Sequence, residues 1–346
     1  MDREALARLA GDDRVPHGSS DDPGVLDFSA NTNPAVPEGA AGVYADALDT
    51  ARSYPDDGYP DYRAAAAAHV DAGPEVAVDP DWVVPTPGGL AAIRLALATA
   101  VDSGDSVLVP APSFGEYARE VRRQGGEPVF VAHDAVLDRD PGDAAAVVVC
   151  NPNNPTGDAY DADALRAFAG RCRASGTLLL VDEAFLGFTD RPSLAGSPGV
   201  VVARSLTKLF GLPGLRTGFA VATGERRDRL AAARRTWNLG VPAAAVGTYC
   251  MGQREFVAET RDRVERERER LRDRLAGGFD VHESAAPFLL LDAGSSERVD
   301  AALAAAREAN LALRDARTFR GLDSHLRVAV RRPDENDRLC EVLADV

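Results

Sequence analysis

The sequence predicts an α/β protein with a large domain, built on a mostly parallel central sheet flanked by helices, and a small α+β domain at its C-terminal end. Short apolar runs alternate with longer stretches of helical pattern from about residue 80 to residue 203. A charge-dense helix follows, and beyond it strand and helix patterns return on a smaller scale. Hydrophobic residues make up 45 % of the 346 residues, which supports a full core and argues against disorder.

The large domain is predicted from four buried strands and the helices between them. Each strand is an apolar run with little polar alternation, which is typical of strands covered on both faces. Since ligands of such sheets bind at the carboxyl ends of the strands, the residues after each strand are the candidates for chemistry. The strands are expected at residues 106–109, 146–150, 177–181 and 200–203, and the helices at 89–100, 115–124 and 162–174.

The small domain is predicted from the pattern after residue 250. Val257, Val264 and Leu271 recur every seventh residue under a charged face, which indicates a long helix through residues 259–275. Strands at 288–291 and 326–330, a helix at 297–309 and a final helix complete this unit. A short helix at 4–10 and a Gly-, Ser-, Asp- and Pro-rich stretch form an N-terminal arm. The predicted boundaries are an arm at 1–35, a large domain at 36–250 and a small domain at 251–346.

Composition argues against several classes of partner. The formal net charge is −15, from 54 acidic and 39 basic residues, whereas nucleic acids and anionic membranes need a basic face. No apolar run approaches a membrane span, and the start of the chain is too charged for a signal peptide. Four scattered cysteines indicate reduced structural thiols and no metal site. We therefore expect a cytoplasmic protein, and the acidic, lysine-poor composition is typical of a salt-loving microbe.

Lys208 is the only lysine among the 39 basic residues. An amine can form a Schiff base with an aldehyde, whereas a guanidinium cannot. One explanation is that a GC-rich genome replaced lysine by arginine and one lysine survived by chance. The other is that chemistry requires an amine here, and the neighbouring residues favour it. Ser205 and Thr207 offer hydroxyls beside Lys208, and Arg216 follows eight residues later, where it could close a phosphate site with them.

Three loops earlier in the chain carry groups suited to a flat, phosphorylated ligand. The glycine turn Gly88-Gly89-Leu90 opens a helix and lets backbone N–H groups approach a phosphate, although such glycines often form only a turn. Phe114 follows the first strand and could stack on a ring or join the core. Asn154 lies in a loop whose density of asparagine and proline exceeds what a plain turn needs, and its amide could donate to a ring oxygen.

Asp182 ends the strand at 177–181, in a position where a carboxylate is costly unless it is paired. It could keep a pyridine nitrogen protonated, which turns the ring into an electron sink. The alternative is that Asp182 caps the N-terminus of a helix.

These residues form an ordered set: Asn-Pro-Thr-Gly at 154–157, Asp-Glu-Ala-Phe at 182–185, and Ser-x-x-Lys at 205–208 with Arg216. Over nearly its whole length the chain resembles fold type I pyridoxal 5′-phosphate (PLP) enzymes of the class I/II aminotransferase family. The resemblance implies the PLP-transferase fold with PLP as cofactor. It implies that Lys208 forms the Schiff base, Asp182 pairs with the ring nitrogen, Asn154 meets the ring hydroxyl and Phe114 stacks on the ring. It places the cofactor phosphate among Gly88, Gly89, Leu90, Ser205, Thr207 and Arg216.

Further residues bear on partners and substrate. Tyr54 matches a tyrosine that such enzymes send into the phosphate site of the neighbouring subunit, which implies a homodimer with shared active sites. The start of the chain, including residues 26–34, and the segment 321–331 are similar to threonine-phosphate decarboxylases of cobalamin biosynthesis. Phe185 stands where histidinol-phosphate aminotransferases usually have tyrosine. The resemblance implies that His17, Asn33, Arg314 and Arg327 bind the two anionic groups of a small amino-acid phosphate.

The function implied by this resemblance is PLP-dependent decarboxylation of L-threonine O-3-phosphate to 1-aminopropan-2-ol phosphate. The alternative is a class I/II aminotransferase such as histidinol-phosphate aminotransferase, since orientation at Cα separates the two reactions. A third interpretation is a PLP-binding regulator. Such proteins usually add a DNA-binding module, for which the chain has neither spare length nor the right charge.

Overall fold

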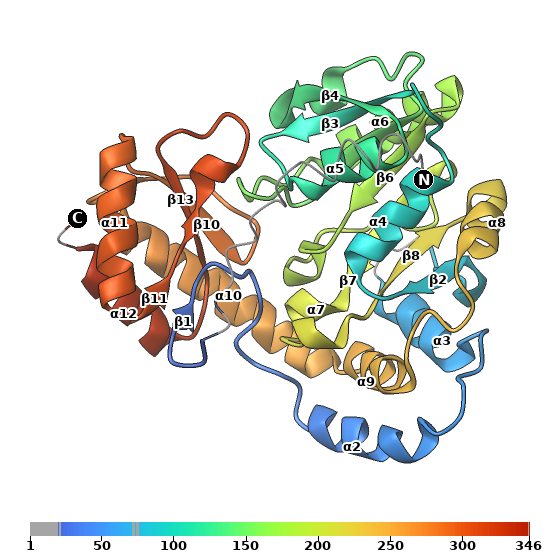
Figure 1. Ribbon diagram of the computed structural model, residues 1–346, viewed down its shortest axis with the longest axis horizontal. Helices are drawn as coiled ribbons and strands as arrows, with labels where there is room; N and C mark the ends of the chain where they lie inside the picture. The colour runs from blue at the N-terminus through green and yellow to red at the C-terminus, as the bar shows by residue number, and fades with distance from the viewer. Residues whose placement is uncertain (1–19, 21, 71–72, 74–75, 345) are drawn as a thin grey trace.

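A seven-stranded sheet lies at the centre of the larger part of the molecule (Figure 1). The computed structural model describes residues 20, 22–70, 73, 76–344 and 346. Only β8 runs antiparallel to its neighbours within this sheet, so the prediction of a mostly parallel sheet is confirmed. The strand order is β2 (Val83–Thr86), β8 (Gly218–Ala222), β7 (Val200–Ser205), β6 (Leu178–Asp182), β5 (Ala146–Cys150), β3 (Ser106–Ala111) and β4 (Glu127–Ala132).

Both faces of this sheet are buried, which explains the continuous apolar runs of its central strands. In β6, Leu178 and Leu180 join a core beneath α4 (Gly89–Ala98), α5 (Glu116–Arg123) and α8 (Gly224–Ala233). The alternate residues, Leu179 and Val181, join a second core. That core is shared with α3 (Pro60–His69), α6 (Ala162–Ser175) and α9 (Val241–Met251).

Local sequence fixes where α6 begins and ends. Asp161 caps its N-terminus, because the side chain accepts hydrogen bonds from the backbone N–H groups of Asp163 and Ala164. Gly176 ends it with φ at 77°, a left-handed conformation that favours glycine. The chain then enters β6 and delivers Asp182 to the carboxyl edge of the sheet.

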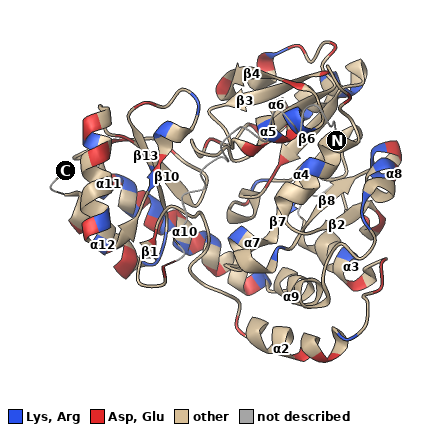
Figure 2. Ribbon diagram, in the orientation of Figure 1, with Lys and Arg blue, Asp and Glu red and all other residues tan. Residues whose placement is uncertain are grey.

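A four-stranded antiparallel sheet forms the core of the smaller part, on the left of Figure 1. Its strand order is β12 (Arg314–Asp315), β13 (His325–Ala329), β10 (Phe288–Asp292) and β9 (Asp280–Val281). The long helix α10 (Arg254–Leu275) leads into it, and α11 (Ser296–Glu308) and α12 (Pro333–Leu343) complete it. In Figure 2 these three helices carry charges of both signs.

The N-terminal segment returns to this smaller part. β1 (Leu26–Asp27) pairs in parallel with β11 (Leu311–Ala312). The backbone N–H of Phe28 then donates to the carbonyl of Ala312, and the carbonyl of Phe28 accepts from the N–H of Ala329. The segment next crosses to the large sheet, where α2 (Ala40–Thr50) follows.

All the predicted strands, and the predicted helices that fall on described residues, are present with small changes of boundary. The N-terminal end of α10 lies five residues before the predicted start of that helix. The predicted list lacked β2, β4 and β8, because β2 has four residues and a proline, β4 is half exposed, and β8 is rich in Gly and Ala. The helix expected at 4–10 lies outside the described residues. The domain boundaries remain predictions. Among the described residues, no helix has the length and apolar character needed to cross a membrane.

Candidate active site

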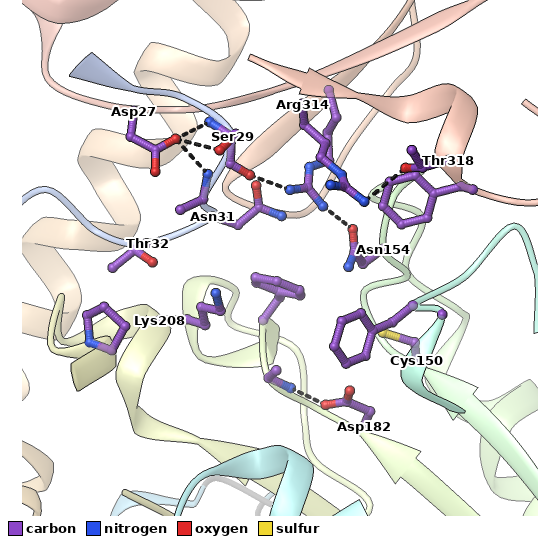
Figure 3. A pocket seen from close by; sticks show the side chains of 18 of the residues that line it. Asp27, Ser29, Asn31, Thr32, Cys150, Asn154, Asp182, Lys208, Arg314 and Thr318 are labelled. Carbon is purple, nitrogen blue, oxygen red and sulfur yellow. Dashed lines mark hydrogen bonds between the residues drawn. The ribbon is translucent and has the colours of Figure 1, made fainter. Parts of the chain in front are cut away.

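A cavity of about 580 Å³ lies between the carboxyl edge of the large sheet and the small sheet (Figure 3). Phe114, Asn154, Asp182 and Lys208 line one side, which we call the large-sheet side. Asn31, Arg314 and Arg327 line the other, which we call the arginine side. In Figure 3, Lys208 and Asp182 lie below, and Arg314 and Thr318 lie above. The structure therefore brings together six of the residues predicted from sequence: Phe114, Asn154, Asp182, Lys208, Arg314 and Arg327.

Lys208 lies on α7 (Leu206–Leu209), a single helical turn that begins where β7 ends. Burial, and after it the positive charges of Arg327 and Arg216, lower the pKa of its ammonium group to about 8. The neutral fraction of this amine near neutral pH is therefore far larger than that of an ordinary lysine. A neutral amine is the form that attacks a carbonyl carbon.

Asp182 ends β6 with its carboxylate buried. Its Oδ1 accepts from the backbone N–H of Ala184 at 3.0 Å, and its Oδ2 accepts from the hydroxyl of Tyr117 at 2.6 Å. Burial raises the pKa of Asp182, whereas the hydrogen bond from Tyr117 opposes that rise. A cation within the cavity would stabilise the ionised form.

The loop that carries Asn154 is held by its other asparagines. Asn153 donates to the carbonyl of Pro112 at 3.1 Å, and Asn151 accepts from the backbone N–H of Tyr160. The side chain of Asn154 remains at the cavity, where its Oδ1 accepts from Arg327. Phe114 lines the cavity and meets Tyr117 edge to face at 5.5 Å between ring centroids.

A cluster beside Lys208 has the form of a phosphate site, and we call it the phosphate cup: Gly88, Gly89, Leu90, Ser205, Thr207 and Arg216. A Cβ atom on Gly88, whose φ is 90°, would lie 2.8 Å from Nη2 of Arg216. One on Gly89 would lie 3.1 Å from Cβ of Ser205, so the positive φ favours glycine at 88 and the close approach of Ser205 favours glycine at 89.

The groups of the phosphate cup are suited to an anion. The hydroxyls of Ser205 and Thr207 form a hydrogen bond with each other at 2.9 Å. No side chain caps the N-terminus of α4, where Gly89 and Leu90 lie, and Arg216 supplies a guanidinium. Backbone donors, hydroxyls and a guanidinium together match the oxygens of a phosphate ester. The residues present thus fit the phosphate of PLP.

Arg314 and Arg327 are each only 5 % exposed, and both have neutral partners. Arg314 donates to the hydroxyl of Thr318 at 2.9 Å. Arg327 donates to the carbonyl of Ser29 at 2.6 Å and to Asn154, while its Nε has no partner. Within the described part of the chain, neither guanidinium forms an ion pair with a carboxylate. Burial, and to a lesser extent the positive charge of Arg314, lower the pKa of Arg327 to about 9. Two buried cations that form no direct ion pair in the described chain are suited to bind anions.

Asn31 lines the cavity although the sequence analysis selected Asn33. Asn31 is buried, and its Oδ1 has no hydrogen-bond partner. Asn33 lies away from the cavity lining, because its Nδ2 donates to the carbonyl of Leu209 at 2.8 Å and to Thr260, and its Oδ1 accepts from Arg263. The structure thus gives Asn33 contacts that anchor the N-terminal segment. The two asparagines stand two residues apart in the same motif, so sequence alone offered no signal to separate them.

Two other predicted residues lie elsewhere. Tyr54 is 76 % exposed and stacks on Trp237, with ring centroids 4.2 Å apart. It belongs to a different face of the molecule from the cavity. His17 lies outside the described residues. Residues absent from the prediction that line the cavity include Tyr117, Cys150 and Arg331.

The fold, the buried lysine and aspartate, and the phosphate cup define a PLP enzyme of fold type I. The chain belongs to the aminotransferase class I and II family, whose model matches residues 23–343. PLP is the cofactor of this family.

Curated relatives fall into two named groups. A histidinol-phosphate aminotransferase from Halobacterium salinarum is 32 % identical over 343 residues, covering 92 % of this chain and 90 % of that protein. A threonine-phosphate decarboxylase from Salmonella typhimurium is 30 % identical over 342 residues, covering 93 % and 91 %.

Solved structures share the fold. L-Threonine-O-3-phosphate decarboxylase from Porphyromonas gingivalis matches with a TM-score of 0.81 at 23 % identity, over 93 % of this chain and 99 % of that one. Histidinol-phosphate aminotransferase from Sinorhizobium meliloti, in complex with PLP, matches with a TM-score of 0.82 at 21 % identity, over 92 % and 91 %. The relatives thus establish the family and the fold and leave two reactions open.

Proposed function

We propose that this enzyme decarboxylates L-threonine O-3-phosphate to (R)-1-aminopropan-2-ol O-2-phosphate and CO2, for cobalamin biosynthesis. The observation that carries the proposal is the pair of buried guanidiniums, Arg314 and Arg327, whose partners are neutral. Threonine phosphate bears a carboxylate and a phosphate on one small molecule, so two cations can each bind one anion. Relatives named threonine-phosphate decarboxylase support this choice of substrate.

The large-sheet side is proposed to hold the cofactor. Lys208 would bond to PLP through its amine, Asp182 would accept a hydrogen bond from the ring nitrogen, and Asn154 would donate to the ring hydroxyl. Phe114 would stack on the ring, and the phosphate cup would bind the phosphate. When bound, PLP supplies an electron sink for the electron pair left on the substrate Cα.

The arginine side is proposed to select which bond at Cα breaks. That bond has to stand perpendicular to the cofactor ring, and the cations set its direction by where they hold the two anions. If the carboxylate is perpendicular, the bond between Cα and the carboxyl carbon breaks and CO2 leaves. Lys208 would be the proton donor to Cα: its Nζ, as an ammonium, would give a proton to Cα after CO2 has left and would take one up again from solvent.

The second candidate is an aminotransferase acting on histidinol phosphate. The relative from Halobacterium salinarum carries that name and is as similar as the decarboxylases. The same cations would hold the phosphate, with the Cα hydrogen perpendicular to the ring instead of a carboxylate. This reaction needs a keto acid as amino acceptor, which decarboxylation does not.

We also propose a homodimer with shared active sites. Four of the large exposed apolar side chains, Tyr44, Leu48, Tyr54 and Trp237, lie on or beside α2 and the loops that flank α3 and α9. No charged residue occurs in α9, which is uncoloured in Figure 2. A second copy covering this face would bring its Tyr54 to the phosphate cup, and the relatives' family supports such an arrangement.

The proposed reaction is tested by CO2 release from threonine phosphate labelled at the carboxyl carbon. Enzyme loaded with PLP should release labelled CO2 without any added keto acid. Turnover of histidinol phosphate that depends on 2-oxoglutarate, with no CO2 from threonine phosphate, would overturn the proposal in favour of the aminotransferase. The Lys208→Ala variant serves as the control for background release.

A further inference from the structure

Tyr117, on α5, contacts the aspartate of the proposed cofactor site. Its hydroxyl donates to Oδ2 of Asp182 at 2.6 Å, and both side chains are buried. The ring of Tyr117 is fully enclosed, with the edge-to-face contact to Phe114 on one side. The position of its hydroxyl is therefore fixed by packing.

Apart from Asp182, the hydroxyl of Tyr117 has one polar neighbour among the groups that act on it. Cys150 is the other group that interacts with it, and the thiol of Cys150 also lies 3.3 Å from the carbonyl of Pro152. Burial, Asp182 and Cys150 all raise the pKa of Tyr117, so the phenol stays protonated and remains a donor. The hydroxyl group of a tyrosine has one hydrogen to donate, and in Tyr117 that hydrogen is directed at Asp182.

We propose that Tyr117 is a positioning residue, which holds Asp182 as an ionised acceptor oriented toward the ring nitrogen of the cofactor. Two fixed donors, the hydroxyl of Tyr117 and the N–H of Ala184, take one lone pair on each carboxylate oxygen. A proton on Asp182 cannot occupy the lone pairs that already accept these hydrogen bonds, so protonation of the carboxylate is disfavoured. The lone pairs that face the cavity remain available to accept a hydrogen bond from the cofactor. This inference rests on the proposed cofactor site and is independent of which reaction follows.

The physical reason is that two opposing effects set the pKa of Asp182. Burial raises its pKa, and the hydrogen bond from Tyr117 is the strongest influence in the opposite direction. Without the hydroxyl, the carboxylate becomes a stronger base and draws the shared proton from the ring nitrogen toward itself. The ring then becomes a weaker electron sink and is held less tightly.

The test is a double-mutant cycle on cofactor binding, measured in the absence of substrate. Tyr117→Phe should weaken PLP binding to the apoprotein about tenfold, as expected for a lost hydrogen bond to a charged group. It should also shift the pH midpoint of the visible absorbance of bound PLP. In the Asp182→Asn background the same substitution should change neither quantity appreciably. Tyr160→Phe is the matched control, because the hydroxyl of Tyr160 donates at the same 2.6 Å to the carbonyl of His133 away from Asp182.

Two results would overturn the inference: unchanged PLP affinity and pH midpoint in Tyr117→Phe, or full additivity of the two substitutions. Should Tyr117→Phe fail to fold, the coupling is measured by stability instead. The double variant regains folding if the hydroxyl acts through the carboxylate, and stays unfolded if it does not. Since no substrate is present, these results cannot be confused with failure of the CO2-release assay.

Discussion

The two sides of the cavity are built in different ways. The large-sheet side takes each group from the end of a neighbouring strand of one sheet, as with Asn154 after β5, Asp182 on β6 and Lys208 after β7. The arginine side joins β12, β13 and the N-terminal segment, and the contact between Arg327 and Ser29 links residues 298 positions apart. One side is thus fixed by a single scaffold, whereas the other depends on an assembly of distant segments.

The two sides also differ in the chemical groups that they present to the cavity. The large-sheet side offers an amine, a carboxylate and an amide, and each has a distinct task toward one rigid ring in the proposed function. The arginine side offers two buried cations, neither of which forms an ion pair with a carboxylate in the described part of the chain. Substitutions on the first side should therefore affect the cofactor, and those on the second should affect the substrate.

The largest expected effect is that of Lys208→Ala. Loss of the amine should remove the lysine-linked absorbance of PLP and reduce turnover by about a thousandfold or more, since bonding and proton delivery both require it. Absorbance spectra and CO2 release measure the two effects. Because no second lysine exists, a lysine-linked band in the variant would contradict the assignment outright.

The next effect tests the arginine side. Arg314→Gln should lower kcat/KM for threonine phosphate by about two orders of magnitude, as expected for a buried cation that pairs with an anion. PLP affinity and absorbance should stay as in the parent enzyme, because the described hydrogen bond of the Arg314 side chain goes to Thr318 on the arginine side. Arg229→Gln, on an exposed helical pair with Glu225, is the control. A loss of PLP with unchanged KM would erase the distinction between the two sides.

A smaller effect separates Asn31 from Asn33. Asn31→Ala should raise KM up to about tenfold with stability nearly unchanged, because its buried carbonyl oxygen has no hydrogen-bond partner among the described residues. Asn33→Ala should lower the free energy of unfolding by about 1–3 kcal/mol, because it removes the hydrogen bonds that Asn33 forms with Leu209, Thr260 and Arg263. Steady-state kinetics and denaturant titration measure these outcomes. The reverse pattern would restore Asn33 as the substrate contact.

The smallest effect concerns pH. The pKa of Lys208 is lowered to about 8, so its neutral, reactive form increases as pH rises through that value. The rate at which PLP attaches to the apoprotein should therefore rise with pH and level off above about pH 8. Arg327→Gln removes a nearby positive charge and should move the midpoint upward. Stopped-flow absorbance measures the rate, and a midpoint near that of free lysine would show that burial does not act on this amine.

The same contrast explains how much the sequence could reveal. Lys208, Asp182 and Asn154 were predictable because each directly follows an apolar run, and the carboxyl ends of parallel strands share one edge. The phosphate cup was predictable for a similar reason, since glycine turns and hydroxyls can be recognised within short motifs.

The arginine side was predictable only in part. Arg314 and Arg327 were predicted through a family resemblance, and both line the cavity. Asn31 lines it too but was not predicted, because register in the N-terminal segment depends on pairing with β11. Tyr117 was missed because a tyrosine in a helix has the same pattern whether its hydroxyl is idle or bonded to Asp182. A hydrogen bond between two side chains of this kind is determined by tertiary packing and leaves no pattern in the sequence.

The parallel pairing of β1 with β11 bears on the order in which the chain can fold during synthesis. The residues that build the large sheet emerge from the ribosome well before β13, which carries Arg327 near the C-terminus. Non-local contacts have to wait for both of their partners. The hydrogen bond between Ser29 and Arg327 can therefore form only after β13 has been synthesised. A nascent chain can assemble the sheet edge that carries Lys208 and Asp182 first, and it gains Arg314 and Arg327 later.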